Sequence, residues 1–414
     1  MKRTLSLLFI LSAFFLFTGC NLTESDKTTD RELPRQLSVQ EQMVAEASND
    51  FSFRLLHMLR EKEEGRSFFV SPLSISTAFA MAMNGSEAET YEQMRDFFGY
   101  DGMTREEINS AYKDLIELLT TLDPQVVMNI ANSVWIREGF PVKEPFLDNN
   151  RNYFDAEVNE LDFSRPDAPD IINQWIEEKT EGLIEEMIDQ IGPLVVMYLI
   201  NAIYFNGDWT VQFDPEETKE SPFYLANGTE ASISMMQARQ QFRYFEDETW
   251  TALDMWYGDA GFSFTALIPT GNTPLDELTS DLTMSIFESI TQNLEKDTLN
   301  IFVPKFEMDY EIEQFPEELK QMGLTLPFDE LKANFSRINE VEQLYISDVL
   351  HRAVIKLDEE GSEAAAVTVI EISRESSGGG SANKTIRLDQ PFLFFIRENN
   401  TNTILFLGTY TGIE

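Results

Sequence analysis

The 414-residue sequence contains a single cysteine, Cys20, and only two histidines, His57 and His351. One cysteine cannot form a disulfide within the chain, and it cannot by itself provide a cysteine-based metal site. Neither histidine belongs to a His-Glu-x-x-His pattern or a similar metal-binding spacing. The sequence therefore predicts no metal, no cofactor and no metal-dependent catalysis.

Basic residues are also scarce. Lysine and arginine together number 31 against 72 acidic residues, which gives a formal net charge of −41. A surface this acidic repels nucleic acid phosphates, anionic membranes and heparin-like polyanions, so we expect none of these as partners. Because salt screens self-repulsion, the composition also suits salty surroundings, and a high-salt habitat is a hypothesis.

The apolar run nearest the N-terminus, Leu5–Phe17, is too short for a comfortable membrane span. It follows the positively charged Met1-Lys2-Arg3 and precedes Thr18-Gly19-Cys20, a pattern that describes an export signal. Gly19-Cys20 resembles a bacterial lipobox, which implies cleavage before Cys20 and lipid on its sulfur. Phe17 departs from the leucine that is usual there, and ordinary secretion is the alternative.

The rest of the chain is typical of one globular domain. Hydrophobic residues make up 43% of the sequence, which includes 32 phenylalanines, and we find no internal repeat. Residues 1–19 are predicted to be a signal peptide, 20–40 a polar tether and 41–414 the domain. Periodicity predicts helices from Glu41 and from Ser71-Pro72. It predicts strands at 129–135, 194–205, 391–396 and 404–408, with two more between 250 and 271.

One stretch, LDEEGSEAAAVTVIEISRESS at 357–377, is unlike an ordinary surface loop. In an extended conformation, the even-numbered residues from Ser362 to Ile372 share an uncharged face, and carboxylates lie on the other face. The segment is therefore suited to enter a sheet with its small face inward. It is equally suited to remain a loop outside the sheet, because Gly361 and the alanines favour neither the strand nor the loop. An edge strand of an α+β enzyme is the alternative.

The residues Glu359-Glu360-Gly361-Ser362-Glu363-Ala364-Ala365-Ala366 resemble the proximal hinge of the inhibitory serpins. Further motifs of that family follow in matching order from about Glu41 to Gly408. They include Ser71-Pro72-x-Ser74, the stretch from Asn201 to Trp209, Val303-Pro304-Lys305-Phe306 and the segment ending in His351. Each motif is weak alone, and together they make the resemblance specific.

The resemblance implies an α+β serpin fold with three β-sheets, a dominant central sheet and eight or nine helices. It also implies an exposed reactive-centre loop at about 359–390. The implied function is irreversible inhibition of serine proteases, and of cysteine proteases as a further target class. The chain would be a monomer and not an enzyme, and its cleaved loop would insert into the central sheet. The alternative is a non-inhibitory serpin that acts as a binding or chaperone protein at the cell surface.

Family positions that meet under the central sheet match Ser71, Ser74, Asn201 and His351, and Trp209 matches the place where the loop first enters. A serine and a histidine also invite the hypothesis of a hydrolase triad. No Gly-x-Ser-x-Gly motif is present, and Ser71 begins a helix led by proline. The resemblance therefore favours a buried hydrogen-bond cluster.

Inhibitory serpins commonly place the scissile residue at the seventeenth position, counting the first glutamate of the hinge as one, so the resemblance implies Glu375, followed by Ser376. Glu375-Ser376 suits a glutamate-specific protease, Arg374-Glu375 suits a trypsin-like one, and Ile372-Ser373 suits an elastase- or subtilisin-like one. The glycines at 378–380 make the C-terminal part of the loop longer than usual, so these alternatives stay open. The export signal predicts a lipid-anchored protein of the bacterial cell envelope, facing the cell surface or the periplasm, or otherwise an extracellular protein.

Overall fold

The computed structural model describes residues 31–271, 273–341, 343–362 and 384–412. These residues form nine α-helices and two short 3-10 helices. They are α1 (Val39–Lys62), α2 (Pro72–Met83), α3 (Ala88–Phe97), α4 (Arg105–Thr121), α5 (Glu144–Phe154), α6 (Ala168–Lys179), α7 (Leu275–Asp281), α8 (Met284–Gln292), α9 (Phe315–Gln321), η1 (Pro215–Glu217) and η2 (Leu326–Phe328). The described part of the chain thus agrees with the expected eight or nine helices.

The central sheet has six strands. In spatial order they are β10 (Phe306–Glu311), β11 (Arg352–Leu357), β12 (Gly361–Ser362), β4 (Met197–Asp208), β2 (Val126–Arg137) and β3 (Glu157–Leu161). β2 and β3 run parallel, whereas the other neighbours are antiparallel. The two long strands β2 and β4 pair along almost their whole length, from Val126 opposite Gly207 to Ile136 opposite Met197.

A second network has nine strands. They are β1 (Phe68–Val70), β15 (Ile404–Tyr410), β14 (Phe392–Glu398), β8 (Phe262–Pro269), β7 (Trp250–Tyr257), β6 (Glu230–Glu246), β9 (Glu295–Pro304), β13 (Thr385–Arg387) and, paired only with β6, β5 (Lys219–Tyr224). The described strands therefore form two hydrogen-bonded networks where three sheets were expected. The number is lower because β6 joins strands into one network: its first part pairs with β5, and its last four residues pair with β7.

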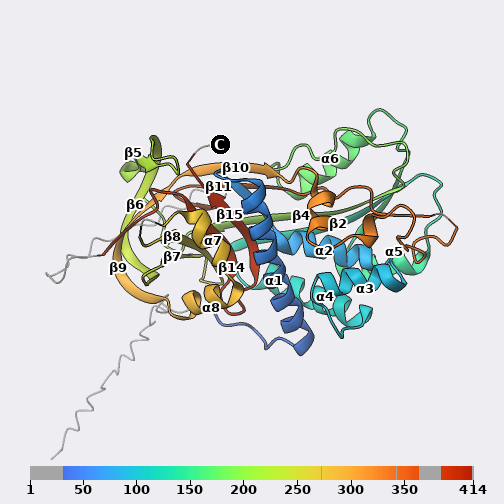
Figure 1. Ribbon diagram of the computed structural model, residues 1–414, viewed down its shortest axis with the longest axis horizontal. Helices are drawn as coiled ribbons and strands as arrows, with labels where there is room; N and C mark the ends of the chain where they lie inside the picture. The colour runs from blue at the N-terminus through green and yellow to red at the C-terminus, as the bar shows by residue number, and fades with distance from the viewer. Residues whose placement is uncertain (1–30, 272, 342, 363–383, 413–414) are drawn as a thin grey trace, which may run out of the picture.

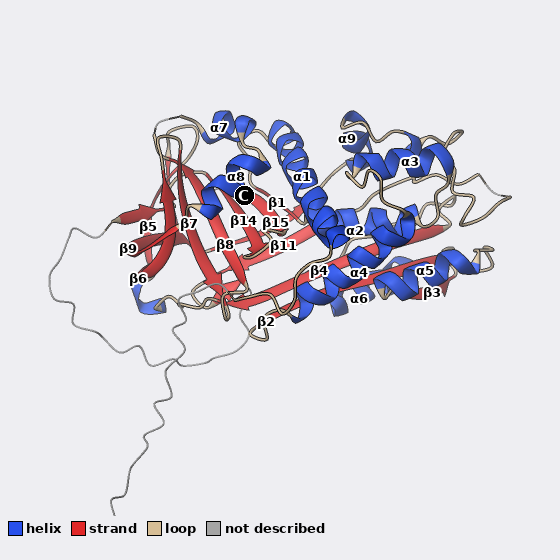
Figure 2. Ribbon diagram, turned by 90° about the horizontal axis from the view of Figure 1, so that it is seen from below, coloured by secondary structure: helices blue, strands red, loops and turns tan. Residues whose placement is uncertain are grey.

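Two hydrophobic clusters lie on opposite faces of the central sheet, as the alternation of side chains along a strand requires. On one face Ile203 and Phe205 of β4 belong to the large core that contains α1 and α2. On the other face Ile200 and Ala202 of β4 pack in a smaller cluster with Trp175 of α6. Figures 1 and 2 show α2–α5 gathered at one end of the molecule and β5–β9 at the other.

Local sequence sets where the two core helices begin. Ser38 and Glu41 form a capping box at the start of α1, so two otherwise unpaired backbone donors are satisfied. Ser71 caps α2, and Pro72 occupies its first turn, as its sequence predicted. Within the described residues, no helix is both long and apolar enough to cross a bilayer.

Part of the predicted tether lies against the domain. The backbone N–H of Arg31 donates to the carbonyl of Ala260 at 3.1 Å, and Asn400 donates to the carbonyl of Arg31 at 2.7 Å. Arg35 binds both carboxylate oxygens of Glu41, at 2.9 and 2.5 Å. The chain from Arg31 to the start of α1 is thus in contact with the domain, while Cys20 and the predicted signal peptide lie outside the described residues.

Candidate functional site

Among the described residues, the central sheet is incomplete between β4 and β11. In this part of the chain, β4 pairs with β2 on one side and, on the other, only with Gly361 and Ser362 of β12. β11 pairs with β10 along its length, but with β12 only through Leu357 opposite Ser362. Beyond Ser362 the described strands β4 and β11 therefore share no ladder of hydrogen bonds. A small pocket between them is lined by Ile203, Phe205 and Ile355, among others, and by Ser362 at its end.

A tight turn at Asp358–Gly361 leads from β11 into β12. The backbone N–H of Asp358 donates to the carbonyl of Gly361 at 2.9 Å, and the Asp358 carboxylate accepts from the N–H of Glu360 at 3.0 Å. Trp209, just past the end of β4, donates its indole N–H to the carbonyl of Asp358 at 2.9 Å. Its backbone N–H donates to the carbonyl of Glu360 at 2.7 Å. The turn is consequently fixed to the end of β4 before the chain enters the sheet.

Glu359 fastens this turn to the neighbouring strands. One carboxylate oxygen accepts a hydrogen bond from Thr218 at 2.7 Å, and the other accepts from the Lys305 ammonium at 2.6 Å. Burial alone would raise the pKa of Glu359, but the bonds from Lys305 and Thr218 outweigh it and hold the pKa below its usual value. In return, the carboxylate raises the pKa of Lys305. We call Glu359, Lys305 and Thr218 the hinge clasp.

Gly361 is required here by close packing. A β-carbon at this position would lie 2.1 Å from the carbonyl oxygen of Gly207 and 2.8 Å from the Cα of Asp208. Its φ lies outside the left-handed region, so glycine is needed here for lack of space and not for its backbone conformation. Any larger residue would push β12 away from β4.

Ser362 is the last described residue of the hinge and is 3% exposed. Its hydroxyl lies 2.5 Å from the hydroxyl of Tyr257, whose ring stacks on Trp209 with a centroid distance of 4.5 Å. The buried hydroxyl of Ser362 therefore has a partner on Tyr257, and Trp209 packs against the ring of that tyrosine. Glu363, Ala364, Ala365 and Ala366 lie outside the described residues, as do the scissile candidates Arg374, Glu375 and Ser376.

The structure brings together Ser71, Ser74 and His351 under the central sheet. The backbone N–H of Ser71 donates to Nε2 of His351 at 3.0 Å, while the backbone N–H of Ser74 donates to the Ser71 hydroxyl at 3.2 Å. Burial lowers the pKa of His351 to about 3, so the imidazole is neutral at physiological pH and carries its proton on Nδ1. The imidazole therefore acts as a hydrogen-bond acceptor that ties the start of α2 to the segment before β11.

This geometry does not provide a hydrolytic Ser–His pair. The Ser71 hydroxyl donates to the carbonyl of Leu405 at 2.7 Å, so its proton is directed away from His351. A nucleophilic serine would instead need its hydroxyl bonded to the imidazole.

Asn201 extends the polar cluster into β2. Its amide donates to the side-chain oxygen of Asn132 at 2.7 Å, and Asn132 donates to the carbonyl of Phe154 at 2.7 Å. The Asn201 carbonyl accepts from the Ser74 hydroxyl at 3.5 Å. The side-chain oxygen of Asn201 is buried and has no partner among the described residues.

Several contacts of the hinge were not predicted from the sequence: those of Thr218, Tyr257, Lys305 and Asp358. Lys305 lies within the Val303–Phe306 motif, but nothing in its spacing links it to Glu359, 54 residues away. Tyr257 and Thr218 belong to other strands and loops, and only folding brings them to the hinge. The one sequence signal that could have indicated a role for Lys305 is its position beside Pro304 at the end of a strand.

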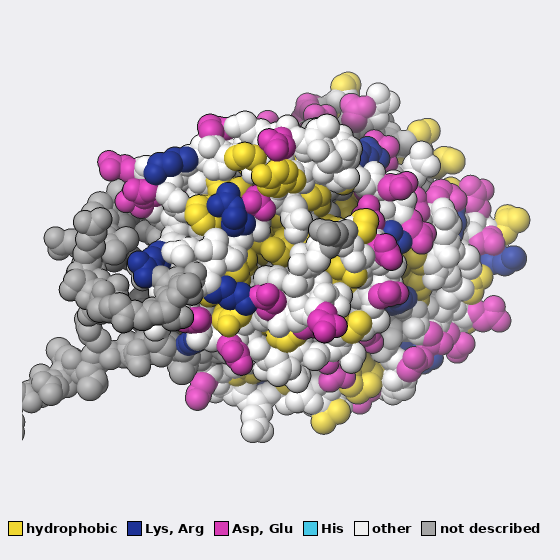
Figure 3. Space-filling model, turned by 60° about the vertical axis from the view of Figure 1, so that its left-hand side comes forward, with side chains coloured by type: hydrophobic (Ala, Val, Ile, Leu, Met, Phe, Trp, Pro, Cys, Tyr) yellow, Lys and Arg dark blue, Asp and Glu magenta, His cyan; other side chains and the backbone are white. Residues whose placement is uncertain are grey.

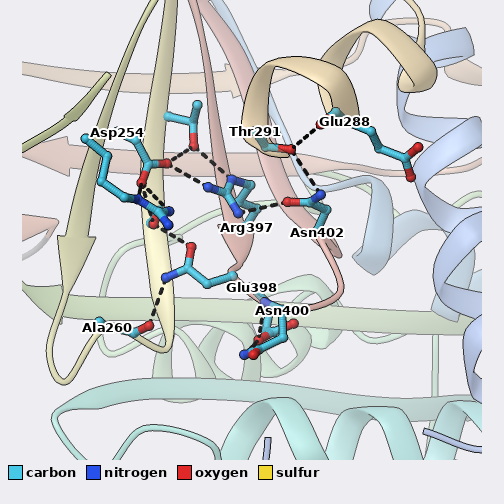
Figure 4. A network of polar contacts seen from close by, with 12 residues as sticks. Asp254, Ala260, Glu288, Thr291, Arg397, Glu398, Asn400 and Asn402 are labelled. Atoms are coloured by element: carbon cyan, nitrogen blue, oxygen red, sulfur yellow. Dashed lines mark hydrogen bonds and ion pairs between the residues drawn. The ribbon is translucent and has the colours of Figure 1, made fainter. Parts of the chain in front are cut away.

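A second buried network joins β7, β8 and β14 (Figure 4). One oxygen of Asp254 accepts from Arg397 at 2.7 Å and from Thr265 at 2.6 Å, and the other accepts from Arg243 at 2.6 Å. Burial would raise the pKa of Asp254, but the two guanidinium groups outweigh it and lower the pKa. Asn402 accepts a further bond from Arg397 at 2.8 Å, which ties the β14–β15 turn to the network.

A family model described as "Serpin (serine protease inhibitor)" matches residues 46–412. The chain is a serpin. An uncharacterized serpin-like protein of Methanosarcina acetivorans is 33% identical over 382 residues, which cover 91% of this chain and 88% of that protein. The native-state crystal structure of the thermophilic serpin tengpin is 29% identical. It superimposes with a TM-score of 0.80, over 93% of this serpin and 98% of tengpin.

A complex of thyroxine-binding globulin with thyroxine is also similar. It is 26% identical with a TM-score of 0.80, and the match covers 89% of this serpin and 98% of that chain. The serpin fold, with its large mixed sheet and its helices, is thereby established. Serpins are mostly protease inhibitors rather than enzymes, but the family also includes non-inhibitory members.

Proposed function

We propose that this serpin is an irreversible inhibitor of serine proteases that traps the acyl-enzyme by inserting its cleaved loop into the central sheet. The observation that carries the proposal is the place between β4 and β11, where Gly361 and Ser362 are the only described residues that pair with both strands. Ser362, a small residue of the hinge, lines the pocket between the two strands.

The chemistry comes from the target protease. Its serine attacks the carbonyl carbon of the scissile residue, an ester forms, and the C-terminal part of the loop leaves with a new amino terminus. The released N-terminal part then adds a strand between β4 and β11, and the attached protease moves with it. About ten new strand residues at ~1 kcal/mol for each net hydrogen bond supply on the order of 10 kcal/mol.

The sequence of the loop supports insertion. Ala364, Ala366 and Thr368 follow Ser362 at alternate positions, so the face that would enter the sheet carries no charge. The opposite face carries Glu363 and Glu371, which would remain in solvent. A buried, unpaired charge on the entering face would oppose insertion strongly.

We further propose a trypsin-like or glutamate-specific target, with cleavage at Arg374-Glu375 or Glu375-Ser376. The signal sequence and Cys20 support export and a lipid anchor in the bacterial envelope, with the inhibitor acting as a monomer. An anchored inhibitor of this kind would protect the envelope against proteases.

The test is incubation with trypsin-, elastase-, subtilisin- and glutamate-specific proteases, followed by denaturing gels and mass spectrometry. We expect a covalent complex that survives denaturation and a released peptide beginning at Glu375 or Ser376. Cleavage without any complex across the panel would contradict trapping and would favour the non-inhibitory binding protein. Mass spectrometry of the exported protein would test lipid on Cys20 independently.

A further inference from the structure

A cavity of about 300 Å³ lies at the C-terminal end of α1. Its other walls come from the residues after β5, the end of β8, the start of α7, the residues before β14 and the end of β15. Figures 1 and 2 show α7 beside α1. None of the described residues that line the cavity belongs to the hinge, the hinge clasp or α8. Small-molecule sites usually measure about 300–1,000 Å³, so this cavity has room for one small ligand.

Arg60, in the last turn of α1, lines this cavity. Its guanidinium forms no hydrogen bond and no ion pair with any residue that the structure describes, and its Nε is buried without a partner. The negative end of the α1 dipole favours a cation here, but no described carbonyl accepts a hydrogen bond from the guanidinium. Burying a cation without a partner is unfavourable, so an acceptor within the cavity would stabilise this side chain.

Two carboxylates also line the cavity, but neither binds Arg60. Glu63 forms an ion pair with Arg66 at 2.5 Å and also accepts a hydrogen bond from the Tyr310 hydroxyl at 3.0 Å. Asp276, in the first turn of α7, lines the cavity but lies beyond ion-pair distance of Arg60. Arg60 is therefore the one cation of this cavity that no described carboxylate neutralises, although the chain has 72 acidic and 31 basic residues.

Apolar side chains form much of the remaining wall. Phe68, Pro269 and Leu275 line the cavity and are buried, while Leu225 and Pro391 line it and are half-buried. Figure 3, which turns the left-hand side of Figure 1 forward, shows yellow side chains gathered among dark blue ones, whereas magenta side chains dominate its right-hand part. A ligand that carries both an anionic group and an apolar body would therefore match the cavity.

We propose that this cavity binds a small carboxylic acid with an apolar body. The carboxylate oxygens accept hydrogen bonds from Arg60, whose planar guanidinium matches a carboxylate in geometry and in charge. The apolar body lies against Phe68 and Leu275 and is thereby removed from water. Because the ligand binds the folded chain and not the unfolded one, it raises the melting temperature. This proposal does not depend on protease inhibition.

The probe is phenylacetate, which combines one carboxylate with one aromatic ring. Phenylacetamide has nearly the same shape without the charge, and acetate has the charge without the ring. The decisive variant is Arg60→Gln, which removes the cation. The matched control is Arg165→Gln, the same substitution at an exposed arginine that does not line the cavity. Titration calorimetry with the intact serpin measures the affinity, and melting curves measure the stabilisation.

We expect the wild type to bind phenylacetate and to melt at a higher temperature in its presence. The affinity should fall by about tenfold or more for phenylacetamide and for Arg60→Gln, because a charged hydrogen-bonded pair is lost. Arg165→Gln should bind phenylacetate like the wild type. No binding of phenylacetate, equal affinity for the amide or for acetate, or unchanged binding by Arg60→Gln would overturn the proposal. The comparison of ligands uses the wild type alone, so it remains decisive if the variant folds poorly.

Discussion

Single residues at the hinge are held by contacts that leave little space. Ser362 is 3% exposed, and its hydroxyl lies 2.5 Å from the hydroxyl of Tyr257, whose ring stacks on Trp209. A long charged side chain at this position would have to displace β12 from the sheet or be buried without a partner. Both outcomes oppose the first step of insertion.

Replacing Ser362 with arginine should therefore turn the inhibitor into a substrate. The protease would still cleave the loop, but insertion would be slower than hydrolysis of the acyl-enzyme, so complex would be replaced by cleaved serpin. Ser362→Ala is the control, because it loses only the hydrogen bond to Tyr257 and should still trap. The ratio of complex to cleaved product on denaturing gels measures the effect, and undiminished trapping by the arginine variant would argue against insertion.

His351 should make stability depend on pH in a defined window. Its pKa is about 3 in the folded state against about 6.5 when unfolded, so the unfolded chain binds more protons between these values. The stabilisation is complete above pH 6.5 and is lost as pH falls, at up to about 1.4 kcal/mol per pH unit.

Urea unfolding of the wild type and of His351→Gln between pH 7.5 and 4.5 tests this, because the many carboxylates contribute equally to both proteins. We expect the wild type to lose stability more steeply below pH 6.5 than the variant. Parallel curves would show that His351 does not remain neutral under the sheet.

At the scale of elements, the hinge clasp joins three parts of the chain. Glu359 belongs to the β11–β12 turn, Thr218 precedes β5, and Lys305 lies between β9 and β10. Because the same turn begins the strand that would be inserted, the clasp restrains the end of the sheet at which insertion would start.

Lys305→Gln should loosen this end of the sheet. Hydrogen bonds to charged groups contribute about 1.5–3 kcal/mol, and the buried carboxylate of Glu359 would lose its cation. We expect a lower thermal midpoint and faster conversion to inserted or polymeric forms on warming. Native gels measure the rate of this conversion. Lys356→Gln removes a more exposed ion pair with Glu307 and is the matched control. If both variants convert at the same rate, the clasp does not restrain the hinge.

The Asp254 network should matter more for stability than the surface ion pairs. Arg397 is 1% exposed, and its removal leaves Asp254 buried with one cation fewer. Arg397→Met should cost about 3–5 kcal/mol of unfolding free energy, whereas Asp254→Asn combined with Arg397→Met should cost less than the sum of the single changes. Chemical denaturation of the three variants measures the coupling, and additive losses would mean that the two groups act independently.

At the scale of the whole molecule, the charge of −41 is carried mainly by exposed acids. Self-repulsion destabilises a compact state, and salt screens it over a Debye length of about 10 Å at 0.1 M. The melting temperature should therefore rise by several degrees between 20 mM and 0.5 M sodium chloride. A melting temperature that does not rise with salt concentration would contradict the hypothesis of a high-salt habitat.

Hydrophobic periodicity and the residues typical of helix and strand ends were sufficient to predict the most regular elements. The helix after Ser71-Pro72, the strands around Asn129–Trp135 and Leu194–Phe205, and the two C-terminal strands all appear in the structure. β6 was not predicted, because its seventeen residues pair with different strands along its length and its burial does not alternate regularly. The single network through β6 was missed for the same reason.

The sequence by itself determined the family, the most regular elements and the small, uncharged face of the hinge segment, because these depend on residue type and on local spacing. Only the tertiary structure decided what Gly361, Ser362 and Glu359 touch, because Gly207, Tyr257 and Lys305 are distant in the chain and meet them through strand pairing. The same holds for His351, whose role as a neutral acceptor follows from burial beside Ser71 and not from any motif.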